Sequence, residues 1–178
     1  MGVDEADLIR RSVNGDESAF ELLLEQYLPS LTNYVMRMMA NTAEADDIIQ
    51  ETFIRLWTHG QKFNPGTAKL TTWLHNIAHN LCIDHFRKHS RLVGESAEQY
   101  DAGATGPEQA YIRQRQVSSI HEAMITLPER QRSAIIMCHY QGLSNKDAAA
   151  VLDVSVDALE SLMARGRRKL KDILENEY

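Results

Sequence analysis

The sequence is poor in cysteine and has no long apolar run, and each absence excludes a class of protein. Its two cysteines, Cys82 and Cys138, lie in different halves of the 178 residues, which excludes a disulfide scaffold and fits a reducing compartment. No run approaches the ~20 apolar residues of a membrane-spanning helix. The polar, acidic residues 1–11 do not form a secretory signal. We therefore expect a cytoplasmic protein that does not insert into membranes.

Patterns typical of catalysis are absent too. The sequence contains no glycine-rich phosphate-binding loop and no recognisable pair of nucleophile and base. Hydrophobic residues make up 43% of the chain and charged residues 25%, a balance typical of globular proteins. We therefore expect a protein that works by binding rather than as an enzyme, and we expect no cofactor.

The net charge of −6 argues against nucleic-acid binding, but the charges are unevenly distributed. Residues 109–178 carry ten basic and nine acidic side chains, whereas residues 1–108 are acidic overall. Five cations crowd into seven positions: Arg165, Arg167, Arg168, Lys169 and Lys171. Because the neutralisation of phosphates drives non-specific binding, this distribution predicts local DNA contact with weak unaided affinity.

Apolar residues repeat at helical spacing through residues 1–89, and no segment shows strand alternation. Asn41 and Glu44 predict a capping box at the start of the clearest helix. The apolar face of that helix contains Ala45, Ile48, Ile49, Thr52, Phe53, Leu56 and Trp57. Residues 90–108 lose the periodicity and are acidic and small, which predicts a flexible linker. We expect an all-α fold of two small helical domains, residues 1–89 and 109–178.

The second domain contains the pattern of a helix-turn-helix. Ser144, with Asp147 three residues later, predicts the start of a short helix, and Ser155 predicts the cap of a longer one after a tight connection. The second helix of such a pair lies in the DNA major groove, with its exposed face on base edges and phosphates. A plain helical hairpin, with the basic run as a solvated face, is the alternative interpretation.

Side chains of metal-ligand types also recur at helical spacing. They are His75, His79, Cys82, His85 and His89, three or four residues apart. One helix cannot complete the tetrahedral coordination of zinc, and the sequence contains no HExxH motif. We therefore expect partly exposed histidines and no metal site.

Three segments resemble, in the right order, regions of one protein family. Region 2.2 of the extracytoplasmic-function (ECF) sigma factors, in the sigma-70 family, is similar to DDIIQETFIRLW. Regions 2.3 and 2.4 resemble TTWLHNIAHNLCIDHFRK, and region 4 resembles LPERQRSAIIMCHYQGLSNKDAAAVLDVSVDALESLMARGRRKL. The resemblance implies a sigma factor that directs RNA polymerase core to promoters, in a stress or envelope response, under the control of an anti-sigma factor.

The resemblance also implies polymerase contacts for both domains. Residues 1–89 correspond to region 2, which binds the clamp helices of the largest polymerase subunit. Residues 109–178 correspond to region 4, which binds the flap of the second subunit. The implied polymerase-binding side chains of region 2 are Asp46, Asp47, Gln50, Glu51 and Arg55. A solvated acidic helix face is the alternative interpretation of these residues.

Region 2 of the family also binds the −10 promoter element. The loop from Lys62 to Leu70 is similar to the family's loop that pockets a flipped-out base, and glycine permits close approach of the backbone. The implied −10 contacts are Lys62, Asn64, Gly66, Asn80, Asp84, Arg87 and Lys88. Trp73 fits either a stacking platform for a base or a core position, and its place in an apolar stripe favours the core.

Region 4 of the family binds the −35 element. The resemblance places Glu160, Ser161, Ala164 and Arg165 on the base-reading face, with Arg165 as the candidate for a guanine. Phosphate contacts are implied for Lys146, Arg167 and Arg168. The sequence departs from the family's usual pattern at His79, Asp157, Glu160 and Gly166. Glu160 could accept a hydrogen bond from a cytosine amine or could weaken DNA contact.

Three rival interpretations remain open at this point. The chain could be a sigma mimic that sequesters an anti-sigma factor without binding promoters, which the acids Asp157 and Glu160 favour. It could be a zinc-dependent enzyme or sensor that uses the His/Cys stripe. It could also be an ordinary repressor or activator that binds DNA tightly without polymerase.

Overall fold

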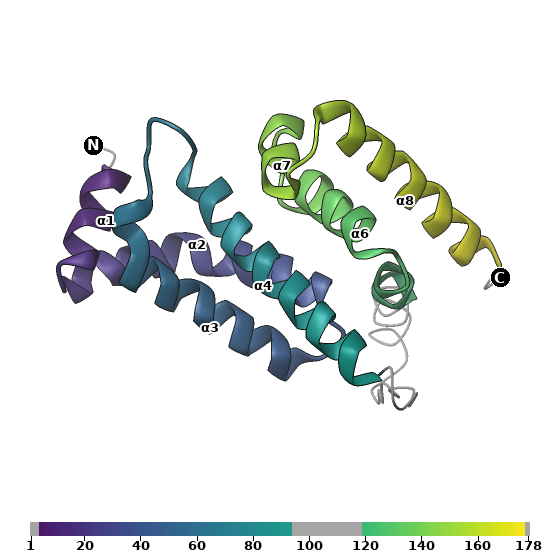
Figure 1. The fold of residues 1–178 in the computed structure, drawn as a ribbon, viewed down its shortest axis with the longest axis horizontal. Coiled ribbons are helices and arrows are strands. Elements are labelled where there is room, and N and C mark those ends of the chain that lie inside the picture. The colour runs from purple at the N-terminus through teal and green to yellow at the C-terminus, as the bar shows by residue number, and fades with distance from the viewer. Residues whose placement is uncertain (1–3, 94–118, 177–178) are drawn as a thin grey trace, which may run out of the picture.

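The computed structural model describes residues 4–93 and 119–176, and every regular element in these two ranges is helical (Figure 1). The first range holds α1 Glu5–Val13, α2 Glu17–Met38, α3 Thr42–His59, the short η1 Gly60–Lys62 and α4 Leu70–Val93. The second range opens with helical residues 119–125 and continues with α6 Glu129–Ile135, the π-helical turn η2 Ile136–Tyr140, α7 Asn145–Leu152 and α8 Val156–Asn176. The expected all-α fold of two small helical domains is confirmed. None of the described helices combines the length and the apolar character that crossing a bilayer requires.

The predicted linker, residues 90–108, begins inside a helix. α4 continues to Val93, so residues 90–93 extend its last turn. Residues 94–108 lie outside the described part of the chain, as do residues 109–118 of the predicted second domain. The boundary predicted at residue 89 therefore falls within a helix, and the linker itself stays a prediction.

Side-chain caps stabilise the starts of three helices in residues 4–93, the first half of the described chain; residues 119–176 form the second half. Side-chain oxygens of Asp4, Asp16 and Asn41 accept hydrogen bonds from backbone N–H groups at the starts of α1, α2 and α3. The predicted cap at Asn41 is confirmed. Glu44, expected to complete a capping box, instead directs its carboxylate to His85 Nε2 on α4, 3.2 Å away.

The apolar stripes of α2, α3 and α4 meet in one core. Among its fully buried side chains are Leu23, Leu31, Tyr34, Leu56, Leu70 and Leu74. Gly60 brings η1 against α1, since a Cβ there would lie 2.9 Å from Val13 Cγ2. This close approach fixes the base of the loop that leads from η1 to α4.

The predicted helix-turn-helix is confirmed in α7 and α8. Ser144 Oγ accepts a hydrogen bond from the Asp147 N–H, and Ser155 Oγ accepts one from the Ala158 N–H, each at 3.1 Å. Between the helices, Asp153 adopts a left-handed conformation with φ of 52°, which aspartate tolerates better than most residues. The turn chemistry read from the sequence therefore determines how the two helices are joined.

Gly166, a departure from the family pattern, has a packing role. A Cβ at this position of α8 would lie 2.7 Å from Ile135 Cδ1 and 3.3 Å from Gln131 Cβ on α6. Glycine in a helix costs up to about 1 kcal/mol relative to alanine. Here the missing side chain lets α8 cross α6 closely, which explains the departure.

The two halves contact each other through a buried polar cluster. Tyr34 OH on α2 lies 3.0 Å from His79 Nδ1 on α4 and 2.9 Å from Ser133 Oγ on α6. Ser133 Oγ lies 3.1 Å from His79 Nδ1, so the three polar atoms form a closed triangle. All three side chains are buried. His79 on α4 thus contacts side chains from both halves.

Further polar contacts surround this triangle. Gln141, just after η2, accepts a hydrogen bond from Ser30 Oγ at 2.7 Å and donates one to Asn33 Oδ1 at 3.0 Å. Lys69 Nζ, just before α4, lies 3.1 Å from the Asp147 carboxylate of α7. α7 accordingly packs against α4, and α6 and η2 contact α2 (Figure 1).

The histidine stripe is divided by burial, which corrects the expectation of partly exposed side chains. His75 and His79 are 1% and 6% exposed, because that face of α4 is covered by α2 and by the second half. Cys82 is fully buried beside them, whereas His85 pairs with Glu44 and stacks on His89. In residues 4–93 and 119–176, no cluster of three or more metal-ligating side chains forms.

Substitution of Gly166 by valine is expected to destabilise the second half by about 1–3 kcal/mol, because the side chain overpacks the crossing with α6. The matched control is Ala164→Val on the exposed face of the same helix, which changes helix propensity alone. Urea denaturation of both variants measures the difference. Equal midpoints for the two would contradict the packing role of Gly166.

Stability is expected to fall as the pH drops from 6.5 toward 4. Burial, and to a smaller extent the charge of Arg130, lowers the pKa of His79 to about 4 from the usual 6.5. Between pH 6.5 and 4 the unfolded chain therefore binds a proton at this histidine that the folded chain does not bind. At pH 5 this difference lowers the free energy of unfolding by about 2 kcal/mol. Burial lowers the pKa of His75 in the same direction.

Denaturation midpoints at pH 7 and pH 5 measure this loss. His79→Gln is expected to lose less stability between the two pH values than the unmodified chain does. His89→Gln, an exposed position on the same helix, is expected to lose as much as the unmodified chain. Indistinguishable pH dependence in the two variants would show that His79 is not responsible.

Candidate protein-binding and nucleic-acid interfaces

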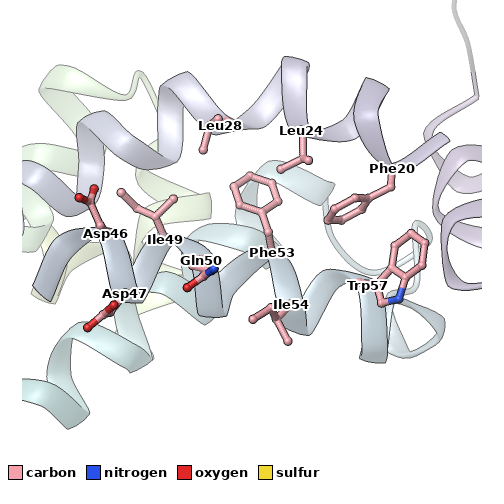
Figure 2. A pocket seen from close by; sticks show the side chains of 10 residues that line it. All are labelled: Phe20, Leu24, Leu28, Asp46, Asp47, Ile49, Gln50, Phe53, Ile54 and Trp57. Atoms are coloured by element: carbon pink, nitrogen blue, oxygen red, sulfur yellow. The ribbon is translucent and has the colours of Figure 1, made fainter. Parts of the chain in front are cut away.

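An apolar groove lies between α2 and α3, next to the predicted polymerase-binding residues (Figure 2). Its volume is about 590 Å³. Its apolar lining consists of Phe20, Leu24, Leu28, Ile49, Phe53, Ile54 and Trp57. We call it the α2–α3 groove. Figure 2 shows Asp46, Asp47 and Gln50 together at one end, with Phe20 and Trp57 at the other.

The predicted polymerase-binding residues divide into two groups in the structure. Asp46, Asp47 and Gln50 are exposed and line the groove. Glu51 and Arg55 are half-buried and pair with each other, with Arg55 Nε 2.8 Å from Glu51 Oε1. The structure therefore brings three of the five to the groove and leaves the other two as an ion pair along α3.

The apolar part of this site was not predicted from the sequence. Leu28 and Ile54 are 39% and 48% exposed, although both are large and hydrophobic. Ile54 lies outside the apolar stripe of α3. This position was the one feature of the sequence that could have predicted an exposed apolar side chain here. The wall contributed by α2 could not be recognised, because Leu24 and Leu28 belong to a stripe that reads as core. Trp57, assigned to the core stripe, is half-buried and packs edge-on against Phe20, with ring centres 4.9 Å apart.

The residues predicted to contact the −10 element lie on two exposed surfaces, one at each end of the segment from η1 to α4. Lys62, Asn64 and Gly66 are exposed in and before the loop that follows η1. Asn64 Oδ1 accepts a hydrogen bond from the Gly66 N–H at 2.9 Å, and a Cβ on Gly66 would lie 3.2 Å from that oxygen. Gly66 itself is exposed, although its N–H is used within the turn. Trp73 is half-buried against Phe63, with ring centres 5.8 Å apart, which supports its assignment to the core.

The second of these surfaces is the outer face of α4. The predicted residues recur at positions that share one helical face, and all are exposed: Asn80, Asp84, Arg87 and Lys88. Arg87 lies 3.4 Å from the Asp84 carboxylate, so one of the two cations is partly neutralised. The face is therefore polar and continuous, with Lys88 as an unpaired cation among its four predicted residues.

The residues predicted to contact the −35 element lie on the exposed side of α8 and on α7. Glu160, Ser161, Ala164 and Arg165 share one exposed face of α8. Arg165 is exposed, and its Nε donates a hydrogen bond to the Ser161 carbonyl at 3.2 Å. All four side chains on this face are exposed in the described part of the chain.

The predicted phosphate contacts are exposed as well. They are Lys146 on α7 and Arg167 and Arg168 on α8. Arg167 lies 3.3 Å from His139 Nε2, toward η2, whereas Arg168 continues the face that carries Arg165. The cations therefore flank the reading face rather than interrupting it.

Comparisons with known proteins agree with this architecture. The Sigma-70 region 2 family matches residues 23–92, and the Sigma-70 region 4 family matches residues 118–170. The RNA polymerase sigma factor NccH of Alcaligenes xylosoxydans xylosoxydans is 31% identical over 98% of this chain and 96% of its own length. The ECF RNA polymerase sigma factor SigE of Mycolicibacterium smegmatis is 34% identical over 90% of this chain, which spans 64% of that relative.

A solved structure shows the same fold. The sigma factor RpoE of Bartonella quintana, in complex with the anti-sigma factor NepR, superposes with a TM-score of 0.74. It is 27% identical, and the match covers 88% of this chain and 96% of that one. Two region matches in order, a relative matched over almost its whole length and a shared fold lead to one conclusion. The chain belongs to the ECF group of sigma factors, in the sigma-70 family.

Proposed function

We propose that this sigma factor docks on core RNA polymerase through the α2–α3 groove and holds promoter DNA with α4, its preceding loop and α8. The observation that carries the proposal is the groove itself, where exposed apolar side chains lie beside exposed carboxylates. Exposed apolar patches of this kind mark binding sites for other macromolecules. The role is one of binding, without catalysis.

The chemistry of the groove fits a helix that carries apolar and basic side chains. Burial of apolar surface contributes about 25 cal/mol per Å², so Leu28 and Ile54 can supply much of the affinity. Asp46 and Asp47 would orient a basic partner and speed its association. The clamp helices of the largest polymerase subunit are the proposed partner, and the flap of the second subunit is proposed for the second half.

Promoter binding through two separate surfaces is compatible with the acidic net charge of the chain. With a net charge of −6, the protein alone has little non-specific affinity for DNA. Held on polymerase, the −10 and −35 surfaces act together, and the second contact becomes intramolecular. This arrangement disfavours an ordinary repressor, which must bind DNA tightly by itself.

An anti-sigma factor is the proposed regulator, acting in the cytoplasm during a stress or envelope response. RpoE of Bartonella quintana, which shares this fold, was solved in complex with the anti-sigma factor NepR. We propose that a similar protein covers the α2–α3 groove of this chain and competes with polymerase. Run-off transcription with purified core polymerase separates this proposal from the sigma mimic, because a mimic yields no transcript.

Ile54→Asp is expected to weaken binding to core polymerase about tenfold or more, because it places a charge in the apolar part of the groove. Ile54 is 48% exposed, so the folded chain tolerates the change. The matched control is Leu22→Asp on α2, which is 44% exposed and does not line the groove. Fluorescence anisotropy with labelled protein measures both affinities, and equal losses would exclude the groove as the docking site.

Arg165→Ala and Arg168→Ala are expected to affect promoter binding by the holoenzyme in different ways. Loss of a guanine contact by Arg165 should cost about 1–3 kcal/mol and relax base preference at one −35 position. Loss of a phosphate contact by Arg168 should weaken binding to all sequences. It should also reduce the slope of the log binding constant against log salt concentration by about one. Binding of each holoenzyme to promoters that differ in the −35 element, at several salt concentrations, distinguishes these outcomes.

A further inference from the structure

The proposed base-reading face of α8 begins with an acid. Glu160 is exposed, one turn before Ala164 and next to Ser161. A carboxylate that approaches DNA is repelled by the phosphates, so an acid here weakens binding unless a base donates a hydrogen bond to it. The partner that holds Glu160 is a neutral amide, since Asn145 Nδ2 on α7 lies 3.2 Å from Glu160 Oε1. This hydrogen bond leaves the carboxylate with further acceptor sites.

Asn145 ties the carboxylate to the other helix of the helix-turn-helix. It is half-buried at the first position of α7, directly after the Ser144 cap. An ionised carboxylate has two oxygens and about four acceptor sites, of which the Asn145 amide occupies one. The hydrogen bond therefore restricts the rotamer of Glu160 and leaves Oε2 free. A side chain held in this way loses little entropy when it binds a base.

The major groove offers few donors to such an acceptor. Cytosine presents its N4 amine there, whereas guanine and thymine present acceptors that repel a carboxylate. Adenine places its N7 acceptor beside its N6 amine, so it is a poorer partner than cytosine. We propose that Glu160, positioned by Asn145, selects a cytosine in the −35 element by accepting a hydrogen bond from its N4 amine. This inference rests on the proposed role of α8 in −35 recognition.

The selection acts mainly by rejecting the wrong bases. A charged acceptor that faces another acceptor loses its water without gaining a hydrogen bond, and this cost falls on guanine and thymine alone. Arg165 lies five residues further along the same face and has the opposite preference, for acceptors. The two side chains together predict a −35 element in which a cytosine and a guanine are both required.

The test uses holoenzyme reconstituted from core polymerase and the full chain, on a promoter pool with a randomised −35 element. Sequencing of the transcripts reports base preference at each position. The unmodified chain is expected to favour cytosine about tenfold at one position. Glu160→Ala should abolish that preference, and Glu160→Gln should shift it toward adenine, which pairs with a side-chain amide. Asn145→Ala should reduce the cytosine preference at the same position and leave the other positions unchanged.

Asp157→Ala is the matched control, because it removes another exposed acid from the first turn of α8. It should leave the cytosine preference intact. An unchanged preference in Glu160→Ala, or a uniform rise in transcription from all −35 sequences, overturns the inference while −35 recognition stands. Transcription by the unmodified chain that is independent of the −35 sequence overturns the proposed role of α8 as well.

Discussion

The contact on which the arrangement of this molecule depends is the buried triangle of Tyr34, His79 and Ser133. It joins α2 and α4 of the first half to α6 of the second through three distances of 2.9 to 3.1 Å. Hydrogen bonds require particular directions, so the triangle sets the orientation of the two halves where an apolar seam alone would permit sliding. With that orientation, α3 and α8 lie on opposite outer sides of the molecule (Figure 1).

The same interface contains polar atoms that it does not satisfy. Within the described residues, His75 Nε2 and Arg132 Nε are buried without a hydrogen-bond partner, and Arg132 is held by stacking on Phe86 at 5.0 Å. Each unsatisfied buried polar group costs about 1–3 kcal/mol. Two further atoms of this kind among the described residues, Ser12 Oγ on α1 and Gln131 Oε1 on α6, lie within the halves, so unsatisfied polar atoms occur both between the halves and inside them.

The distribution of charge follows the same division. Asp46 and Asp47 lie beside the apolar groove of the first half, whereas Arg165 and Arg168 lie on the outer face of α8. The net charge of −6 does not reveal this separation, because it sums acidic and basic side chains that lie on different surfaces. Glu160 is the exception, an acid on a basic face, and its hydrogen bond to Asn145 is what makes a specific role for it testable.

The sequence by itself determined the helices, their caps at Asn41, Ser144 and Ser155, and the exposed faces that carry the candidate contacts. These features depend on neighbours within about four residues, so periodicity and capping chemistry suffice to predict them. Only the tertiary structure decided that His75 and His79 are buried, that Ile54 opens onto a groove with α2, and that Gly166 permits a helix crossing. Each of these depends on side chains from helices distant in the sequence, whose meeting no local pattern records.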